Sequence, residues 1–406
     1  MSQRIVIIGG GHAAAQLCQG LASAGLGPHT TLVCAEAEPP YQRPPLSKRF
    51  LQDPQATVQT LLSVEQLGTQ GFTIHQGKTA TAIDTASKTV QLASGAKLSW
   101  DWLVLATGAR ARTIATLAHL DNVTTLRQAH DAIRLRDRLP AARHVTVIGG
   151  GFIGLEIAAT AASLGKSVTV IEAAPRLLAR AISPDLSARI AAHHRQAGVD
   201  IRLQACVADY RIDGGRVTHL VLGDELLPTD LVIVGIGAIP ETALAEQAGI
   251  ACDDGVLVDP LMQTSAPGVL ATGDCARLCA GPGLPSVRLE SVQNANDQAR
   301  AAVATLRGEP KPYDAVPWFW SDQGTLRLQM AGLLPPDVTS SVVRQGQDVA
   351  SCSLFHYRGD ILACVESVNA PGDHLAARRM LQSGIHPAPA QVGDATVPLV
   401  NLLRAA

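Results

Sequence analysis

Two segments of the chain share one hydrophobic pattern. Each starts with a β-branched apolar run, passes through glycines and continues as a helical pattern, once from Arg4 to Ala24 and again from His144 to Leu164. A second apolar run then ends near an acid, Glu36 in the first copy and Glu172 in the second. Strand, glycine turn, helix and strand form the βαβ unit that opens a doubly wound parallel sheet.

Further apolar runs end in glycine turns and carry the chain between these units. They lie at 104–110, 231–238 and 269–274, and short alternating runs with clustered aromatics follow from Trp318 onward. The pattern predicts an α/β protein with two Rossmann-like dinucleotide-binding domains and a small C-terminal α+β domain. The expected boundaries are 1–111 and 239–315 for the first dinucleotide domain, 112–238 for the second and 316–406 for the C-terminal domain.

The glycines of both units have the spacing of a dinucleotide fingerprint. The first motif is Gly9-x-Gly11-x-x-Ala14 and the second is Gly149-x-Gly151-x-x-Gly154. The first glycine permits the tight turn, the second lets backbone approach a pyrophosphate, and the third small residue brings helix and strand together. Free N–H groups and the helix dipole then favour the phosphates. Two such motifs in matching contexts indicate two nucleotide sites.

The acids after the second strands point to the nucleotides. Glu36 and Glu172 can each accept hydrogen bonds from ribose hydroxyls, and the first ribose position falls on Ala35 or Glu36. A carboxylate at Glu172 favours NADH over NADPH, and Arg176 and Arg180 just downstream can soften that preference. Two dinucleotides that exchange a hydride are most simply an exchangeable nicotinamide and a permanently held FAD.

Length and composition limit the classes of protein to which the chain can belong. With 406 residues, 17% charged residues and a net charge of −2, the chain is long enough for several domains and lacks the basic excess of a nucleic-acid-binding protein. Its longest apolar stretches, such as 231–239, are far shorter than the ~20 residues of a membrane span. The 8 cysteines contain neither C-x-x-C nor zinc spacing. We therefore expect a cytoplasmic protein without a structural disulfide or a bound metal.

The sequence resembles the oxygenase-coupled ferredoxin reductases, the family of putidaredoxin reductase and of the biphenyl and toluene dioxygenase reductases. The resemblance covers essentially the whole chain, in order, and its most specific parts are Arg43–Lys48 and Trp318–Gln323. The other matching segments are 103–109, 149–156, 235–240, 272–276 and 288–292. The family's cofactors imply FAD and NADH here, with NADPH also possible.

The resemblance and the motifs together give the candidate site residues. For FAD they are Gly9, Gly11, Ala13, Ala14, Glu36, Arg43, Lys48, Ala80, Thr107, Gly108, Arg127, Asp274, Glu290, Val292 and Trp320. For NADH they are Gly149, Gly151, Phe152, Ile153, Gly154, Glu156, Glu172 and Gly237.

Three of these residues have roles near the reacting atoms in the family. Lys48 stabilises negative charge on reduced flavin, Glu156 pairs with that lysine from the first turn of its helix, and Trp320 lies against the flavin. The alternatives are a solvated surface lysine, an acid that satisfies the helix dipole, and an aromatic that only packs in the core.

The resemblance implies how electrons leave. Related enzymes keep one or two cysteines beside the flavin, but residues 37–60 contain none, which excludes a thiol relay. The expected acceptor is a [2Fe-2S] ferredoxin that serves a Rieske aromatic-ring dioxygenase or a cytochrome P450, and the enzyme is expected as a monomer or homodimer. Two alternatives stay open: a rubredoxin or quinone reductase of the same fold, and a non-catalytic binding protein similar to apoptosis-inducing factor.

Overall fold

The computed structural model describes residues 3–279, 286–346, 348 and 350–403, so small parts of the predicted segments 1–111, 239–315 and 316–406 lie outside it. Within the described residues the chain forms two compact units. The first unit comprises 1–43, 57–110 and 238–315, and the second comprises 44–56, 111–237 and 316–406. No helix of these described ranges has the length and apolar character needed to span a membrane.

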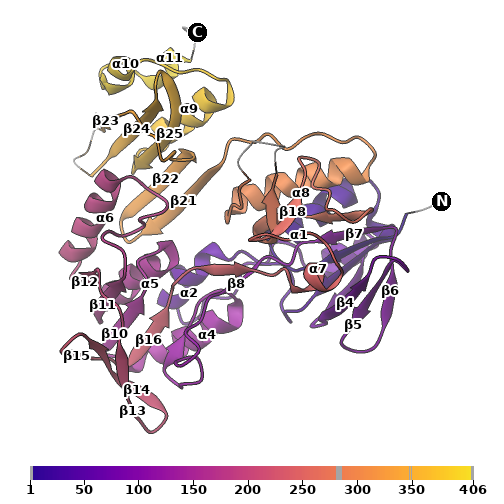
Figure 1. The fold of residues 1–406 in the computed structure, drawn as a ribbon, viewed down its shortest axis with the longest axis horizontal. Helices are drawn as coiled ribbons and strands as arrows, with labels where there is room; N and C mark the ends of the chain where they lie inside the picture. The colour runs from indigo at the N-terminus through magenta and orange to yellow at the C-terminus, as the bar shows by residue number, and fades with distance from the viewer. Residues whose placement is uncertain (1–2, 280–285, 347, 349, 404–406) are drawn as a thin grey trace. The chain divides into compact units, whose positions relative to one another are not determined.

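The first unit is built on a five-stranded parallel sheet with strand order β19-β7-β1-β2-β3. Helix α1 follows β1 directly, and α8 packs along α1 (Figure 1). A separate antiparallel sheet consists of β4, β5 and β6. The elements are β1 (Ile5–Ile8), α1 (His12–Ser23), β2 (Thr30–Cys34), α3 (Val64–Thr69), β3 (Thr73–Gln76), β4 (Ala80–Asp84), β5 (Thr89–Leu92), β6 (Lys97–Ser99), β7 (Trp102–Leu105), α7 (Ala243–Gln247), β18 (Val256–Val258), β19 (Val269–Ala271), β20 (Ala276–Leu278) and α8 (Val292–Leu306).

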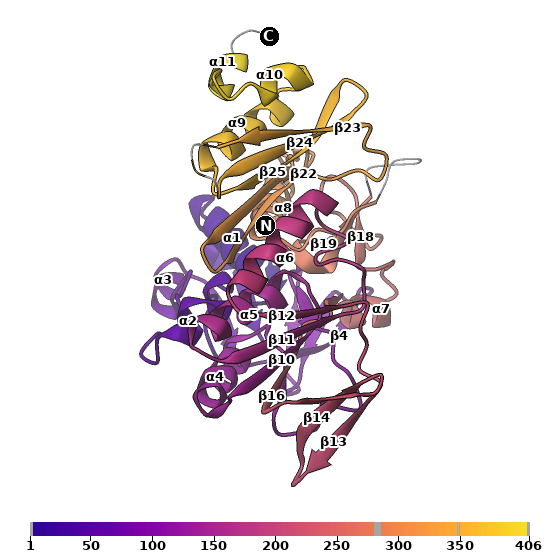
Figure 2. The same cartoon turned by 90° about the vertical axis from the view of Figure 1, so that its left-hand side faces the viewer.

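The second unit contains a five-stranded parallel sheet, β12-β11-β10-β16-β9, and a five-stranded antiparallel sheet, β21-β22-β25-β24-β23. Figure 2 shows α5 and α6 beside the parallel strands β10, β11 and β12. The elements are α2 (Arg49–Gln52), β9 (Val123–Thr124), α4 (Ala129–Arg138), β10 (His144–Ile148), α5 (Phe152–Ser163), β11 (Ser167–Glu172), α6 (Pro184–Gln196), β12 (Asp200–Leu203), β13 (Asp209–Asp213), β14 (Arg216–Leu222), β15 (Glu225–Pro228), β16 (Leu231–Val234), β21 (Trp318–Gln323), β22 (Leu326–Gly332), β23 (Ser340–Gln345), β24 (Cys352–Arg358), β25 (Ile361–Val368), α9 (Pro371–Gln382), α10 (Pro389–Gly393) and α11 (Leu399–Leu402). Two short strands of the first unit, β8 (Ala109–Ala111, of which Ala111 already belongs to the second unit) and β17 (Ala238–Pro240), pair with each other.

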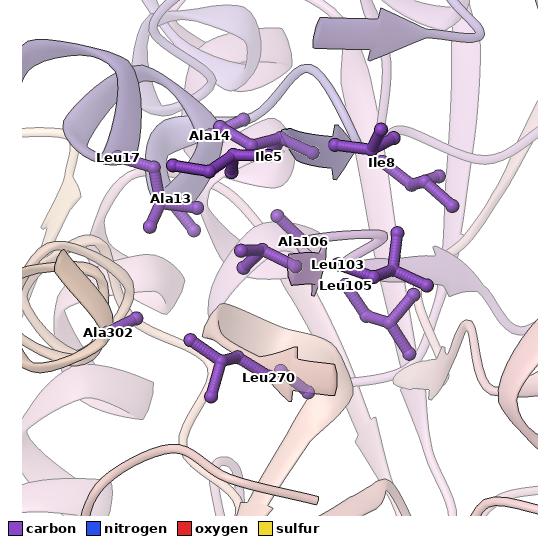
Figure 3. Close-up of a cluster of buried hydrophobic side chains, with 14 of the residues drawn as sticks. Ile5, Ile8, Ala13, Ala14, Leu17, Leu103, Leu105, Ala106, Leu270 and Ala302 are labelled. Carbon is purple, nitrogen blue, oxygen red and sulfur yellow. The ribbon is translucent and has the colours of Figure 1, made fainter. Parts of the chain in front are cut away.

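Continuous apolar runs explain why the central strands form parallel sheets. All four residues of β1 and all four of β16 are buried, as expected for strands covered on both faces. Figure 3 shows the core of the first unit, a buried cluster to which α1 contributes the small residues Ala13 and Ala14 and the sheet contributes Ile5, Leu103 and Leu270. This architecture confirms the predicted fold class, with two Rossmann-like sheets and an antiparallel C-terminal sheet covered by α9.

Candidate functional site

The first glycine loop connects β1 to α1 and leaves no room for a side chain at Gly9. Gly9 has φ +134°, and a Cβ there would lie 2.0 Å from the carbonyl oxygen of Ala106. Gly11 is the N-cap of α1 and provides no side-chain cap, and the first turn holds no acidic residue. The N-terminus of α1 is therefore left for an anion, which fits a dinucleotide pyrophosphate.

The predicted ribose acid stands beside this loop. Glu36, two residues after β2, accepts hydrogen bonds from Tyr41 Oη at 2.5 Å and from Arg43 Nη2 at 2.6 Å. A Cβ on Gly11 would lie 4.0 Å from Arg43 Nε, so Arg43 extends over the glycine loop. The structure thus brings Glu36, Arg43 and the loop together, as the sequence suggested, while their contacts with FAD remain predictions.

The other FAD candidates of the first unit come from several of its elements. The turn before Asp274 packs on α1, because a Cβ on Gly273 would lie 3.2 Å from Ala13 Cβ. Thr107 Oγ1 donates to the carbonyl of Glu241 at 2.7 Å, and Gly108 has φ +72°. The remaining candidates are Ala80 at the start of β4, Glu290 in an ion pair with Arg288, and Val292 at the start of α8.

The second glycine loop repeats this geometry between β10 and α5. Gly149 has φ +107°, and a Cβ there would lie 2.3 Å from the carbonyl oxygen of Gly235. A Cβ on Gly154 would lie 2.5 Å from the carbonyl oxygen of Gly149, so only glycine lets α5 approach the loop. Gly151 is the N-cap of α5 and provides no side-chain cap, Phe152 and Ile153 are the first two residues of the helix, and Gly237 has φ +101°.

Glu172 at the end of β11 is already engaged with its own loop. Its Oε2 accepts from the Gly150 N–H at 2.6 Å and its Oε1 from the Ala174 N–H at 2.7 Å. The Arg176 guanidinium donates to the carbonyls of Ala179 and Ile182 at 2.7 and 2.9 Å. Of the two arginines that the sequence marked, Arg176 therefore stabilises the loop.

Half-buried Lys48 and buried Glu156 form an ion pair inside the second unit. Lys48 Nζ lies 2.8 Å from Glu156 Oε2, and the glutamate side chain is only 4% exposed. The same carboxylate accepts from Ser47 Oγ at 2.5 Å on Oε2 and from Ser321 Oγ at 2.6 Å on Oε1. The contact between lysine and glutamate that the family resemblance implied is thus present.

Two features of this pair were not foreseen. Glu156 is the fifth residue of α5 and not in its first turn, because the helix already begins at Phe152. The serine partners were also missed, although Ser47 and Ser321 stand inside the two sequence segments that carry the resemblance most specifically. Their position in those segments was the only available signal.

The two remaining candidates of the second unit are Trp320 and Arg127. Trp320 stacks on Trp318 with ring centroids 5.8 Å apart. The backbone N–H of Arg127 donates to Asp131 at 3.0 Å just before α4. Neither arrangement tests a contact with FAD, so both assignments remain predictions.

No cysteine of the described residues is placed as a nucleophile beside these loops. All eight are free thiols. Burial, and secondarily the Glu36 charge, raises the pKa of Cys34 to about 12, and burial also raises the pKa of Cys275. These thiols therefore stay protonated at neutral pH.

Comparison with known proteins follows the same division of the chain. The family model described as pyridine nucleotide-disulphide oxidoreductase matches residues 3–299, and the model described as reductase C-terminal matches residues 318–403. A terpredoxin reductase of Pseudomonas sp. is 40% identical over 98% of both chains. The ferredoxin reductase for the CYP199A2 system from Rhodopseudomonas palustris superimposes with a TM-score of 0.93 at 38% identity, over 98% of this chain and 99% of that one. A covalent putidaredoxin reductase–putidaredoxin complex gives 0.94 at 36% identity, over 100% and 99%.

Proposed function

Because the chain belongs to the pyridine nucleotide-disulphide oxidoreductase family, we propose that it is an NADH:ferredoxin reductase that carries FAD. The observation that supports this proposal most is the presence of two glycine loops in one chain. Each loop lies at the N-terminus of a helix that has no side-chain cap, and each is followed by a carboxylate, Glu36 or Glu172. FAD and NAD(P)H are the cofactors that this family membership implies. When bound, FAD supplies the conversion between a two-electron donor and a one-electron acceptor.

The chain's own residues divide this work. The Gly9 and Gly149 loops bind the two pyrophosphates, and Glu36 and Glu172 orient the adenosine riboses. Lys48 holds a positive charge against Glu156, where it can stabilise negative charge that develops nearby. Residues 37–60 contain no cysteine, so electrons leave without a thiol intermediate.

The acceptor is inferred from the relatives, which are named for terpredoxin, putidaredoxin or a ferredoxin. We infer a [2Fe-2S] ferredoxin that feeds a Rieske dioxygenase or a cytochrome P450, and a cytoplasmic enzyme that is a monomer or homodimer. A rubredoxin or quinone acceptor is the alternative within the same fold.

Reconstitution tests the proposal directly. The purified protein should release FAD and not FMN on denaturation, and NADH oxidation should depend on an added acceptor. Turnover should be compared with a [2Fe-2S] ferredoxin, a rubredoxin and a small quinone, with cluster-free ferredoxin as the control. The ferredoxin is expected to give the highest kcat/KM. FMN in place of FAD, or faster turnover with rubredoxin or quinone, would contradict the proposal.

A further inference from the structure

Strand β21 presents two chemically different faces within the second unit. Trp318 and Trp320 stack on one face, as alternation along a strand requires. The intervening residues face the helices of the parallel sheet: Phe319 contacts Phe152 edge-to-face, Ser321 bonds to Glu156, and Gln323 bonds to His194. Ser321, Gln323 and His194 are completely buried.

The polar residues of this second face form one continuous chain of hydrogen bonds. His194 Nε2 lies 2.9 Å from Gln323 Oε1, and Gln323 Nε2 lies 3.5 Å from Ser321 Oγ. Ser321 Oγ lies 2.6 Å from Glu156 Oε1. The chain runs from α6 across the end of β21 to α5, and it reaches the carboxylate oxygen that Lys48 does not contact.

Hydrogen-bond chemistry gives this chain one direction. The Ser321 hydroxyl must donate to the carboxylate, because an ionised Glu156 has no proton to give. The Ser321 oxygen is then free to accept, and among the described residues the donor that faces it is the amide nitrogen of Gln323. The amide oxygen consequently faces His194, whose Nε2 must carry the proton. Successive donors in one direction polarise one another and strengthen the final bond to Glu156.

The surroundings of His194 favour the same tautomer. Its Nδ1 is buried and has no hydrogen-bond partner among the described residues. An unpaired acceptor is less unusual in a protein interior than an orphaned N–H, so the proton belongs on Nε2. Burial lowers the pKa of His194, and the neighbouring His193 adds to the effect against the Gln323 hydrogen bond. The imidazole is therefore neutral at pH 7.

We propose that His194, Gln323 and Ser321 are positioning residues, a one-way chain of donors that holds the Glu156 carboxylate in place beside Lys48. Within the described residues the side chain of Lys48 bonds to Pro44 and Glu156, so the three residues act on it through Glu156. The inference rests on the proposed function, in which Lys48 and Glu156 assist hydride transfer from NADH. It gives a role to Ser321 and Gln323 of the Trp318–Gln323 segment, which the proposed reductase function by itself does not explain.

Loss of this chain of hydrogen bonds should lower the rate of flavin reduction and leave the binding of NADH unchanged. One missing donor to the carboxylate should slow flavin reduction by about 3- to 10-fold, with the apparent Kd of NADH unchanged. His194→Leu removes the terminal donor, and Ser321→Ala removes the direct one. His194→Gln restores an amide N–H near the former Nε2 position and should recover the rate to within about 2-fold. His193→Leu alters the half-exposed neighbour and serves as the control.

Two measurements on the FAD-loaded enzyme test the proposal. Nitrogen NMR of labelled histidines, with the His194 signal identified from its loss in His194→Gln, should show a neutral ring protonated on Nε2. Stopped-flow reduction by NADH measures the rates of the variants and of Lys48→Ala.

The outcomes separate the inference from the proposed function. A proton on Nδ1 overturns the inference, even if the leucine variant does not fold. Slow flavin reduction in Lys48→Ala together with normal rates in His194→Leu and Ser321→Ala also overturns the inference. The proposed function as a reductase is then unaffected. Failure of the enzyme to oxidise NADH with any of the acceptors would contradict the proposed function. The tautomer of His194 would still test the chain of hydrogen bonds independently. Slowing by His193→Leu equal to that by His194→Leu would count against a specific role.

Discussion

Lys48 is the single residue whose loss should change chemistry most while sparing the fold. In Lys48→Ala, the buried Glu156 carboxylate keeps its bonds from Ser47 and Ser321, so the second unit should remain folded. A lost charge contact worth roughly 1–3 kcal/mol corresponds to about 5- to 150-fold slower flavin reduction. Stopped-flow absorbance with NADH measures the rate, and the FAD content per chain should not change. An unaltered rate in flavin-replete protein would reduce Lys48 to a structural partner of Glu156.

Glu172 should decide the choice between NADH and NADPH. A 2′-phosphate at this position meets a carboxylate, and Arg176 is committed to the carbonyls of its own loop. Glu172→Gln removes a repulsion of about 1 kcal/mol and should raise the NADPH/NADH ratio of kcat/KM by roughly 5-fold. Glu225→Gln, on the surface strand β15, is the charge-matched control. An unchanged ratio would show that Glu172 does not bind the ribose.

His374 makes the stability of the second unit depend on pH. Burial, with added repulsion from Arg378 and Arg327, lowers the pKa of His374 from 6.5 to about 4. Below pH 6.5 the unfolded chain binds a proton that the folded chain does not, so stability falls until about pH 4 and then levels off. The expected loss is about 3 kcal/mol. Urea unfolding at several pH values should show this component in the wild type and not in His374→Leu; equal pH profiles would contradict it.

At the scale of elements, α5 packs so closely on its glycine loop that adding a single methyl group should destabilise the protein. Gly154→Ala places a Cβ 2.5 Å from the Gly149 carbonyl, which must move and distort the pyrophosphate site. We expect a stability loss of roughly 1–3 kcal/mol and a higher KM for NADH. Gly68→Ala in α3 meets open space and should be neutral or stabilising by about 0.5–1 kcal/mol. Thermal unfolding and steady-state kinetics compare the two, and equal effects would refute the packing argument.

The same elements show how far sequence reasoning reaches. Both βαβ units were predictable because apolar runs, glycine spacing and helical periodicity are local signals. Glu156 was assigned to the first turn of its helix, whereas α5 begins at Phe152 and has Glu156 as its fifth residue. The pairing of Glu156 with Lys48 followed from the resemblance, but its serine partners were not predictable, since Ser321 lies 165 residues from Glu156 in sequence and meets it only through tertiary packing. A motif marked Ser321 and Gln323 without indicating what they bind.

At the scale of the whole molecule, the second unit joins two segments that the sequence presents as separate domains. Leu155 and Leu186 of the nucleotide-binding part share one buried cluster with Leu328 and Leu354 of the C-terminal sheet. Completely buried Glu366 of β25 accepts from the N–H and the hydroxyl of Ser183, the N-cap of α6. The predicted boundary at 316 remains a prediction, but these contacts favour cooperative unfolding.

Glu366→Gln tests this cooperativity. The amide keeps one acceptor where the carboxylate had two, and it weakens the bonds to Ser183 and to His356 Nε2, which lies 3.0 Å from Oε2. We expect a loss of about 1–3 kcal/mol that lowers hydrogen-exchange protection in α6 and β25 together. The exposed Glu309→Gln should leave both unchanged. Protection lost in only one of the two elements would show that they unfold independently.

The stacked face of β21 gives the molecule an internal optical reporter. Trp318 and Trp320 lie with ring centroids 5.8 Å apart and planes 29° apart, close enough for their electronic transitions to couple as an exciton pair. The chain has only four tryptophans, and the other two, Trp100 and Trp102, belong to the first unit. A circular dichroism couplet from this pair therefore reports the geometry of β21 alone, the strand whose opposite face holds the donors to Glu156, without any added label.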